Sequence, residues 1–597
     1  MSTSRILSMR DLEFMLYEWL NVGELVRWPR YSEHSRDSFD EFLTVAHQVA
    51  ERYFADHNAR ADREPPRMEG GRVRLLPEVE SALTAFAAAG LTSATLDDAL
   101  GGVQLPQVIH RACFAWMQAA NISTAGYALL STAGANLILS HGCADQIDRY
   151  VRPLAEGRFF ATMCLSEPQA GSSLGDVTTL ASPDADGHYR IRGTKMWISG
   201  GDHEMGENIV HLVLARTPES PPGTKGLSLF IVPKYLVTET GERGQRNDVV
   251  LAGLNHKMGN RGTVNAVLAF GDGAHEPLGS GGAIGYLIGA EGSGLTSMFH
   301  MMNEARIGVG AGAAALGYTS YLHALDYAKT RPQGRLPGAK NAELPQVPII
   351  RHPDVRRMLL ASKAYVEGAL GLVLLTARLF DESVATPDEA RRAAAARLLG
   401  VLTPVVKSWP AQWCLAANDH AIQVHGGYGY TIDYPVEQFY RDNRLNAIHE
   451  GTNGIQALDL LGRKVVEDEG AGLACLVAVI RATTSSARAG QFGGWARQLD
   501  DAIETVETVT QKLWRDGEAD RALAAASVYL EAFGHVVVAW VWLQQAMAAG
   551  VTAGPFYDGK RAAARYFFTH ELPRAMTQLD SLEDARDLFL ALDPDIL

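Results

Sequence analysis

The stretch Ile209-Val-His-Leu-Val-Leu-Ala215 is an apolar run of strand-forming residues in a chain whose other apolar residues mostly follow helical spacing. Leu227-Ser-Leu-Phe-Ile-Val232 and Ala266-Val-Leu-Ala-Phe270 have the same character, and glycine and proline turns separate the three runs. Together they predict a β-rich region from residue 160 to about residue 280. The fold class that we expect is mainly α with a β-rich middle domain.

Helical regions flank this middle region on both sides. Upstream, apolar residues recur at helical spacing within residues 11–55 and 77–155, with a polar stretch between them. Downstream, the chain is helical from about residue 293 to residue 468. The Gly- and Pro-containing stretch Glu276-Pro-Leu-Gly-Ser-Gly-Gly282 reads as the linker between the β-rich and helical parts.

Two further features complete this organisation. Between Pro332 and Pro353 several prolines oppose a continuous helix, so we expect a loop there. Beyond residue 469, the spacing of Leu499, Ile503, Val506, Val509 and Leu513 indicates an added helical domain. We therefore expect four domains, over residues 1–159, 160–280, 281–468 and 469–597.

Composition and charge exclude several classes of protein. The 597 residues are 47% hydrophobic, and a net charge of −14 without a concentrated basic run makes nucleic acid an unsuitable partner. Five cysteines without a paired motif fit a reducing compartment and suggest no metal site. The N-terminus lacks the apolar core of a signal peptide, and the apolar tract Val536–Leu543 is too short to cross a bilayer. We expect a cytoplasmic protein without a transmembrane segment, and a buried helix at that tract.

The segment Ala447-Ile-His-Glu-Gly-Thr-Asn-Gly-Ile-Gln456 places one carboxylate, Glu450, between apolar residues and a glycine. A carboxylate that removes a weakly acidic proton from carbon needs a raised pKa, which apolar burial supplies. Gly451 would let a substrate approach the backbone closely. The alternative is that Glu450 only pairs with Arg441 or Arg444 in a helical domain.

Two earlier segments are candidates for ligand contacts, and the first of them suits a polar ring edge or a phosphate. In Met163-Cys-Leu-Ser-Glu-Pro-Gln-Ala-Gly-Ser-Ser-Leu-Gly175 an apolar run breaks into a turn with hydroxyls and backbone amides, although a plain surface connection has the same composition. Tyr189-Arg-Ile-Arg-Gly-Thr-Lys-Met-Trp-Ile-Ser-Gly200 predicts a hairpin with Trp197 near its end. Trp197 could stack on a cofactor or belong to the core.

These three segments, in this order, resemble the acyl-CoA dehydrogenase family of flavoenzymes. Asn303-Glu-Ala-Arg306 and Gln423-Val-His-Gly-Gly-Tyr-Gly-Tyr430 resemble two further motifs of that family, and the likeness runs from about residue 100 to 465. The resemblance implies a helical N-terminal domain, a β-barrel-like middle domain and a C-terminal helical bundle. The extra helical domain is similar to that of the longer bacterial type, which includes enzymes acting on 3-(methylthio)propanoyl-CoA and on fatty acyl-CoAs.

The resemblance also implies a role for each matched residue, with FAD as the cofactor. Glu450 would be the catalytic base, and the substrate would meet Gly171, Ser172, Asn303, Arg306 and Gly451. The flavin ring would lie against Leu165, Ser166, Trp197 and Ser199. The remaining cofactor contacts would come from Arg331, Gln333, Gln423, Gly426, Gly427 and Thr452. Arg331 would reach the flavin diphosphate of a neighbouring subunit, so we expect a homodimer or a higher homo-oligomer.

The chain departs from the common family pattern at two places. A Pro and Gly follow Arg331 where Arg-x-x-Phe-Gly is usual, so that Arg335 or Gln333 could substitute, and Gly454 replaces a frequent glutamine. Some relatives carry the base one residue before the helix arginine, but that residue here is Ala305, which accepts no proton. Its neighbour Glu304 is rotated by about 100° along a helix. Glu450 remains the preferred base.

The implied reaction is α,β-dehydrogenation of an acyl-CoA thioester, with electrons leaving to an electron-transfer flavoprotein. Three alternatives remain. An acyl-CoA oxidase would use the same base and flavin but pass electrons to oxygen. A relative without chemistry would only bind flavin, and a structural helical protein would require all five motifs to be coincidental. The acyl chain is not named by the sequence, because one or two methylenes change binding by only about 1–3 kcal/mol.

Overall fold

The computed structural model describes residues 4–184, 187–338, 341 and 343–597, which form two compact units. We call residues 1–39, 106–115 and 309–597 the first unit, and residues 40–105 and 116–308 the second unit. Three helices run through both ranges: α2 (Arg36–Val49), α5 (Gln107–Ala120) and α9 (Gly294–Thr330). The four expected domains are continuous ranges of the chain, whereas each compact unit combines separate ranges. The division into four domains therefore stays a prediction.

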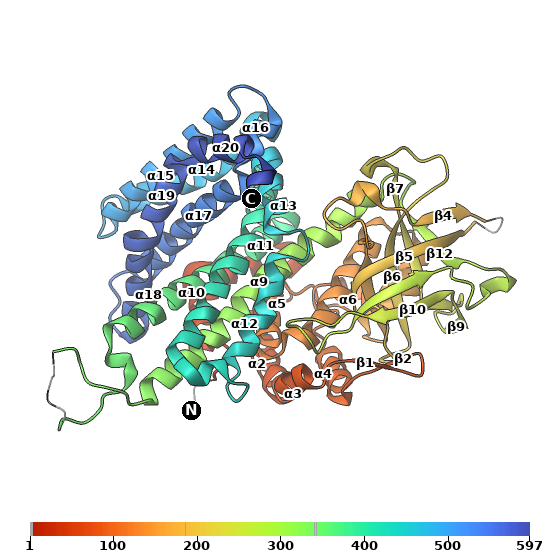
Figure 1. Cartoon of the computed structure of the whole chain (residues 1–597), viewed down its shortest axis with the longest axis horizontal. Coiled ribbons are helices and arrows are strands. Elements are labelled where there is room, and N and C mark those ends of the chain that lie inside the picture. The colour runs from red at the N-terminus through yellow and green to blue at the C-terminus, as the bar shows by residue number, and fades with distance from the viewer. Residues whose placement is uncertain (1–3, 185–186, 339–340, 342) are drawn as a thin grey trace. The chain divides into compact units, whose positions relative to one another are not determined.

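The second unit is built on an eight-stranded sheet with the order β10-β11-β5-β12-β7-β6-β3 and with β4 beside this path (Figure 1). All neighbours on the path are antiparallel except β3 and β6, which run parallel. The three apolar runs of the sequence lie in β6, β7 and β11, as predicted. The strand bounds are β3 (Phe159–Cys164), β4 (Leu180–Pro183), β5 (Tyr189–Ser199), β6 (Asn208–Arg216), β7 (Leu227–Pro233), β10 (Val249–Leu254), β11 (Asn265–Phe270) and β12 (Ala283–Ile288).

Strand β4 turns part of this sheet into a closed ring. It pairs with β5 on one side and with β6 on the other, and β5 and β6 are already linked through β12 and β7. The ring closes at the pairing of Leu180 in β4 with Arg216 in β6. The predicted mainly helical fold with a β-barrel-like middle domain is confirmed.

Residues 189–199 form one continuous strand, so the predicted hairpin is wrong. Gly193, near the centre of that segment, lies within β5 and not in a turn. A Cβ at Gly193 would lie 2.5 Å from Oγ1 of Thr179. The glycine therefore lets the chain before β4 approach closely, and it makes no turn.

The sheet continues beyond the expected linker at residues 276–282. Strand β12 follows this segment directly and pairs with both β5 and β7. Asn247 holds its start, because Asn247 Oδ1 accepts from Ile284 N at 2.8 Å and Asn247 Nδ2 donates to Ile284 O at 2.9 Å. The segment is thus a connection within the sheet and does not end the β region.

Helices cover the sheet and complete the core of the second unit. Leu137 and Ile138 of α6 pack in one cluster with β3, β6 and β7, and Met298 and Met301 from the start of α9 join it. Two short pairs, β1 (Arg67–Glu69) with β2 (Arg72–Arg74) and β8 (Tyr235–Val237) with β9 (Arg243–Arg246), lie outside the main sheet. The other helices are α3 (Asn58–Arg63), α4 (Pro77–Ala88), α6 (Ile122–His141), α7 (Ala144–Gln146) and α8 (Arg152–Ala155).

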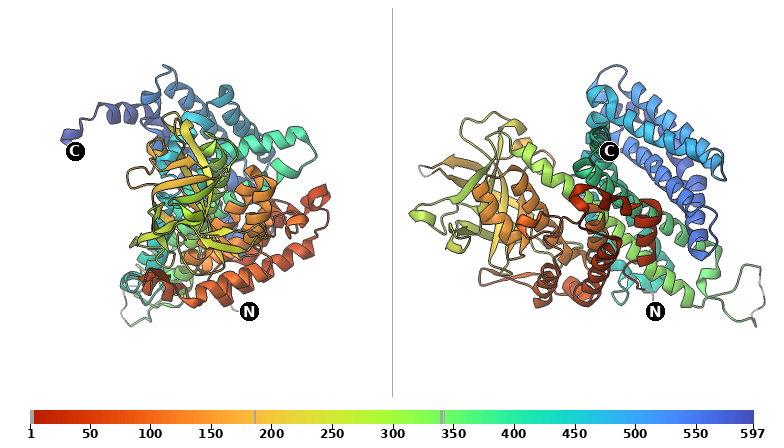
Figure 2. Two further views of the ribbon diagram at one scale, coloured as in Figure 1. Left: turned by 90° about the vertical axis from the view of Figure 1, so that its right-hand side faces the viewer. Right: turned by 180° about the vertical axis from the view of Figure 1, so that it is seen from behind.

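The first unit is a helical bundle in which α10 and α11 pack along each other, and the later helices gather beside them (Figures 1 and 2). Its remaining α-helices are α1 (Met9–Glu13), α10 (Pro353–Ala385), α11 (Glu389–His425), α12 (Val436–Arg444), α13 (Asn453–Asp459), α14 (Glu467–Ala487), α15 (Gly493–Leu513), α16 (Ala519–Leu523), α17 (Ala526–Ala549), α18 (Pro555–Tyr566), α19 (Leu572–Asp580) and α20 (Leu582–Ala591). The predicted apolar stripe of residues 499–513 is buried on α15. The described residues between α9 and α10 hold no α-helix, as the prolines predicted.

Within the described residues, four helices are apolar enough to span a bilayer by length and composition alone. The buried share of their apolar windows is 67% for α6, 89% for α10, 39% for α14 and 83% for α17. All residues from Val536 to Leu543 in α17 are buried. The prediction of a buried helix at this tract is confirmed.

Candidate functional site

In the second unit, a β-bulge in strand β5 turns Trp197 outward. Strand β11 pairs Ala266 with Ile198 and Leu268 with Lys195, so two residues of β5 face one residue of β11. Trp197 has φ +67°, a left-handed value that is strained for a tryptophan, and 56% of its surface is exposed. The Trp197 ring is exposed although its backbone conformation is unfavourable, which makes this ring a candidate surface for stacking a ligand. Ser199 lies half-buried at the end of the same strand.

The two predicted flavin segments meet within this unit. Leu165 and Ser166 directly follow β3, and Lys195 Nζ donates to Leu165 O at 2.9 Å. Met196 N donates to Ser166 O at 3.0 Å. The loop after β3 is therefore attached to the bulge that carries Trp197, and the plain surface connection does not describe it.

Sequence reasoning assigned no role to the ion pair that locks this junction. Lys195 Nζ lies 2.9 Å from Glu167 Oε1, and the two side chains are 0% and 2% exposed. Thr178 and Thr179 also donate to the Glu167 carboxylate through their backbone amides and hydroxyls. Burial opposes ionisation of Glu167, but Lys195 and these hydrogen bonds outweigh it and lower its pKa to about 2. The neighbours of Lys195 in β5 are exposed or half-buried, so no local pattern indicated that this lysine is buried and needs a partner.

The predicted substrate residues of the second unit lie in different environments. Gly171 and Ser172 are exposed after the turn at Glu167–Ala170, and Asn303 is exposed on α9. Arg306 is buried, with its guanidinium 5.7 Å from the ring centre of Phe299. The rival base Glu304 already accepts a hydrogen bond from Asn136 Nδ2 at 2.9 Å.

In the first unit, the segment of Glu450 is a tight turn. Glu450 has φ +54° and Gly451 has φ +83°, so two successive residues take the left-handed conformation. Gln456 Nε2 donates to the carbonyl oxygens of Glu450 and Gly451 at 3.1 and 3.4 Å. A Cβ at Gly451 would lie 2.5 Å from this nitrogen, which explains the glycine. Strain of this kind clusters at functional sites.

Thr452 directly precedes α13 and is its N-cap residue. Its hydroxyl accepts from Ile455 N at 3.3 Å, so the predicted cofactor contact competes with a capping role. Arg441 pairs with Glu437 at 2.7 Å. Glu437 is therefore one carboxylate partner of Arg441, four residues before it on α12.

Four predicted cofactor residues line one cavity of about 430 Å³ in the first unit: Arg331, Gln333, Gly426 and Gly427. A Cβ at either glycine would meet no atom within 4 Å, so a ligand can approach this backbone. The exposed Arg331 forms no ion pair within the described part of the chain, and its guanidinium lies 5.9 Å from the ring centre of Tyr428. A guanidinium, open backbone and an aromatic ring suit the phosphates and base of a nucleotide. The residues present therefore fit the tail of FAD.

Two expectations about this nucleotide region find no support in the lining of the cavity. Gln423 is exposed on the last turn of α11 and does not line it. Arg335 Nε donates to Leu344 O at 2.6 Å within its own loop, and Arg335 does not line the cavity. Gln333 lines it, so Gln333 is the better candidate for the nucleotide contact.

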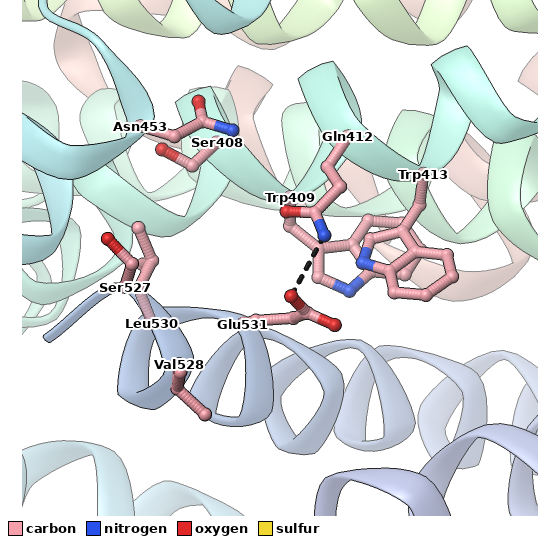
Figure 3. A pocket seen from close by; sticks show the side chains of 9 residues that line it. All are labelled: Ser408, Trp409, Gln412, Trp413, Asn453, Ser527, Val528, Leu530 and Glu531. Carbon is pink, nitrogen blue, oxygen red and sulfur yellow. Dashed lines mark hydrogen bonds between the residues drawn. The ribbon is translucent and has the colours of Figure 1, made fainter. Parts of the chain in front are cut away.

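A second cavity, of about 150 Å³, lies between α11, α13 and α17 (Figure 3). The indole rings of Trp409 and Trp413 form part of its wall, and Gln412 Nε2 donates to Glu531 Oε2 at 2.9 Å. Asn453, three residues beyond Glu450, reaches its edge. No predicted site residue lines it, and nothing in the sequence pattern indicated it.

Comparison with known proteins places these segments in a family. Residues 37–158, 162–272 and 292–465 match the models described as acyl-CoA dehydrogenase N-terminal, middle and C-terminal domain, and residues 476–593 match one described as acetyl-CoA dehydrogenase C-terminal like. The 3-methylmercaptopropionyl-CoA dehydrogenase of Ruegeria pomeroyi is 36% identical over 95% of this chain and 97% of its own length. The broad-specificity linear acyl-CoA dehydrogenase FadE5 of Mycobacterium tuberculosis is 34% identical over 99% of this chain and 98% of its own.

Solved structures show the same fold. An acyl-CoA dehydrogenase of Bacillus anthracis complexed with FAD aligns with a TM-score of 0.73 and 20% identity, covering 98% of this chain and 93% of that one. ACDH-11 of Caenorhabditis elegans, in complex with C11-CoA, aligns with a TM-score of 0.70 and 19% identity over 94% and 90% of the two chains. The chain belongs to the acyl-CoA dehydrogenase family, and it is an FAD-dependent oxidoreductase with that family's additional C-terminal domain.

Proposed function

We propose that the protein removes the α and β hydrogens of an acyl-CoA thioester to form the trans-2-enoyl-CoA, with Glu450 as the base. The observation that carries this proposal is the backbone of Glu450, whose φ of +54° is retained in a turn that Gly451 and Gln456 brace. A strained carboxylate next to a glycine suits a group that must be presented to a substrate.

The chain's own groups have separate tasks in this proposal. Glu450 accepts the α proton, and its backbone amide polarises the thioester carbonyl, where negative charge develops. Bound FAD supplies the acceptor for the β hydride. Leu165, Ser166, Trp197 and Ser199 hold the ring, and Arg331, Gln333, Gly426 and Gly427 hold the nucleotide tail.

The finer assignments rest on the family and on named relatives. Arg306 and Asn303 orient the substrate, with Gly171 and Ser172 along its thioester tail. We place straight acyl chains first, because two of the similar proteins are named for linear acyl-CoA and butyryl-CoA, and 3-(methylthio)propanoyl-CoA second. An electron-transfer flavoprotein takes the electrons, and a cytoplasmic homodimer completes the nucleotide site through Arg331.

The test is an anaerobic visible spectrum of the purified protein before and after addition of butanoyl-, octanoyl-, hexadecanoyl- or 3-(methylthio)propanoyl-CoA. Bleaching of the flavin bands by one of these acyl-CoAs supports the reaction and identifies the preferred acyl chain of the substrate. Bound flavin that no thioester reduces would overturn it. Peroxide formation in air, at the rate of turnover, would identify the oxidase instead.

The variant Glu450→Gln tests the base directly. It keeps the size of the side chain and removes its basicity, so we expect bound flavin and a loss of reduction of about 10³-fold or more. Glu304→Gln is the matched control, and it should retain reduction because Glu304 is engaged by Asn136. A normal rate in Glu450→Gln would remove this residue from the role.

A further inference from the structure

A continuous line of buried amide side chains ends at the residue before Glu450. Asn418 Nδ2 donates to Ser320 Oγ at 2.6 Å, and Asn443 Nδ2 donates to Asn418 Oδ1 at 2.6 Å. Asn446 Nδ2 donates to Asn443 Oδ1 at 2.9 Å, and His449 Nε2 lies 3.0 Å from Asn446 Oδ1. We call Ser320, Asn418, Asn443, Asn446 and His449 the amide ladder.

The ladder is deeply buried and firmly anchored. Asn418 and Asn443 are 0% exposed and Asn446 is 3% exposed. Its inner end is attached to the backbone of α9, since Asn418 Nδ2 also donates to Leu316 O at 3.1 Å and Asn443 Nδ2 to Ala313 O at 3.2 Å. Buried amides are costly unless they are satisfied, so a chain of them specifies one arrangement.

The hydrogen bonds of the ladder all run in one direction. Each amide offers its NH₂ group toward α9 and its oxygen toward the next member. The oxygen of Asn446 therefore requires a donor, which makes His449 the tautomer that carries its proton on Nε2. Burial and the nearby Lys407 lower the pKa of His449 to about 3, so the ring is neutral at pH 7.

The other end of the ladder meets the turn of Glu450. His449 is joined to Glu450 by one peptide bond, and Glu450 and Gly451 both have left-handed φ values. Gln456 holds the carbonyl oxygens on the far side of the turn. The peptide unit between His449 and Glu450 is thus held from both sides, through the imidazole ring before it and the carbonyl groups after it.

We propose that the amide ladder is a positioning device for Glu450, which fixes the peptide unit of residues 449–450 and with it the carboxylate and the backbone amide of Glu450. This inference rests on the proposed function. His449 and the three asparagines do not touch the reacting atoms; they act by holding the turn. A misplacement of about 1 Å at a reacting group can lower a rate by about 10²-fold, so a neutral scaffold of this kind affects turnover more than binding.

The experiment compares His449→Phe with His449→Gln in the holoenzyme. Phenylalanine keeps the ring but removes the donor to Asn446, whereas glutamine carries an amide donor of similar reach. We expect His449→Phe to lower kcat by about tenfold or more, with KM and FAD content within about twofold of the wild type. His449→Gln should recover most of the loss. The substrate is whichever of the four acyl-CoAs above reduces the wild-type flavin fastest.

Thr510→Val provides the matched control, because it removes another buried hydrogen bond of the first unit, that of 2.6 Å between Thr510 Oγ1 and Tyr529 OH. It should lower the Tm without changing kcat. Asn446→Ser is a second variant, which shortens the ladder one step earlier and should act like His449→Phe.

Each remaining result counts against one of the two proposals. A wild-type kcat in His449→Phe, or equal losses of kcat in His449→Phe and His449→Gln, would overturn the positioning role. The assignment of Glu450 as the base would not be affected, because Glu450→Gln tests it separately. If His449→Phe and Asn446→Ser both fail to fold while Thr510→Val folds, the ladder is only a folding element and the positioning role is wrong. Failure of every thioester to reduce wild-type flavin would instead overturn the proposed function itself.

Discussion

The bulge at Trp197 and the turn at Glu450 each hold a non-glycine residue in a left-handed backbone, but they are braced by different chemistry. Behind Trp197 the brace is a buried ion pair between Lys195 and Glu167. Behind Glu450 it is a line of neutral amides. A buried charge without its partner is far more costly than a buried amide without one. The ion pair should therefore dominate stability, and the amides should mainly control geometry.

Removal of the cation should have the largest effect on stability. Lys195→Met leaves the Glu167 carboxylate buried without its ionic partner, and we expect a loss of about 3–5 kcal/mol in the free energy of unfolding. Urea denaturation measures the loss, and the FAD content of the purified protein should fall with it. The double variant Lys195→Met/Glu167→Gln should recover part of the stability. If Lys195→Met is as stable as the wild type, the charged brace is not what holds the bulge.

The same ion pair should give the fold a specific dependence on acid. The pKa of Glu167 is lowered to about 2, below its value in an unfolded chain of about 4.3. The ionised group therefore stabilises the fold above pH 4.3, and this contribution is lost as the pH falls from there toward 2. We expect about 3 kcal/mol of the stability difference between wild type and Glu167→Gln to disappear over this interval. A difference that is constant from pH 7 to pH 3 would contradict the shift.

The uncharged brace of the Glu450 turn can be disturbed at Gly451, with a smaller expected loss in the free energy of unfolding. Gly451→Ala introduces a Cβ at φ +83° and 2.5 Å from Gln456 Nε2, which should cost about 1–3 kcal/mol. The turn of Glu450 must then shift. We therefore expect a large drop in the rate of flavin reduction together with only a small drop in the Tm. Gly454→Ala is the control, because its Cβ would meet only Thr452 Oγ1 at 3.7 Å. Equal behaviour of the two variants would show that the shape of the turn is unimportant.

The local sequence was informative wherever one segment carries its own signal. The apolar runs at residues 209–215 and 227–232 became strands, and the stripe of residues 499–513 became the buried face of α15. The errors came from glycines whose role depends on a distant segment. The segment around Gly193 was predicted to form a hairpin because no local pattern reveals that Thr179 packs against this glycine. Residues 276–282 looked like a linker although they lead back into the sheet.

In the candidate site, too, the sequence revealed the local motifs but not the contacts between distant segments. The motifs around Ser166, Trp197 and Glu450 were recognisable as segments, and the structure attaches the first two to each other. The braces were not recognisable. Lys195 and Glu167 are 28 residues apart, and Asn418 and Asn443 are 25 residues apart, so their partnership exists only after folding.

The sequence by itself indicated the family, most of the helices and strands, and the residues proposed for the chemistry, because motifs and hydrophobic periods are local properties of the chain. Only the tertiary structure decided how those residues are held: the closure of the strands through β4, the outward turn of Trp197, the shared cavity of Arg331 and Gly427, and the amide ladder behind Glu450. The physical reason is that burial and hydrogen-bond satisfaction are fixed by neighbours in space. Those neighbours come from helices and strands far apart in the chain.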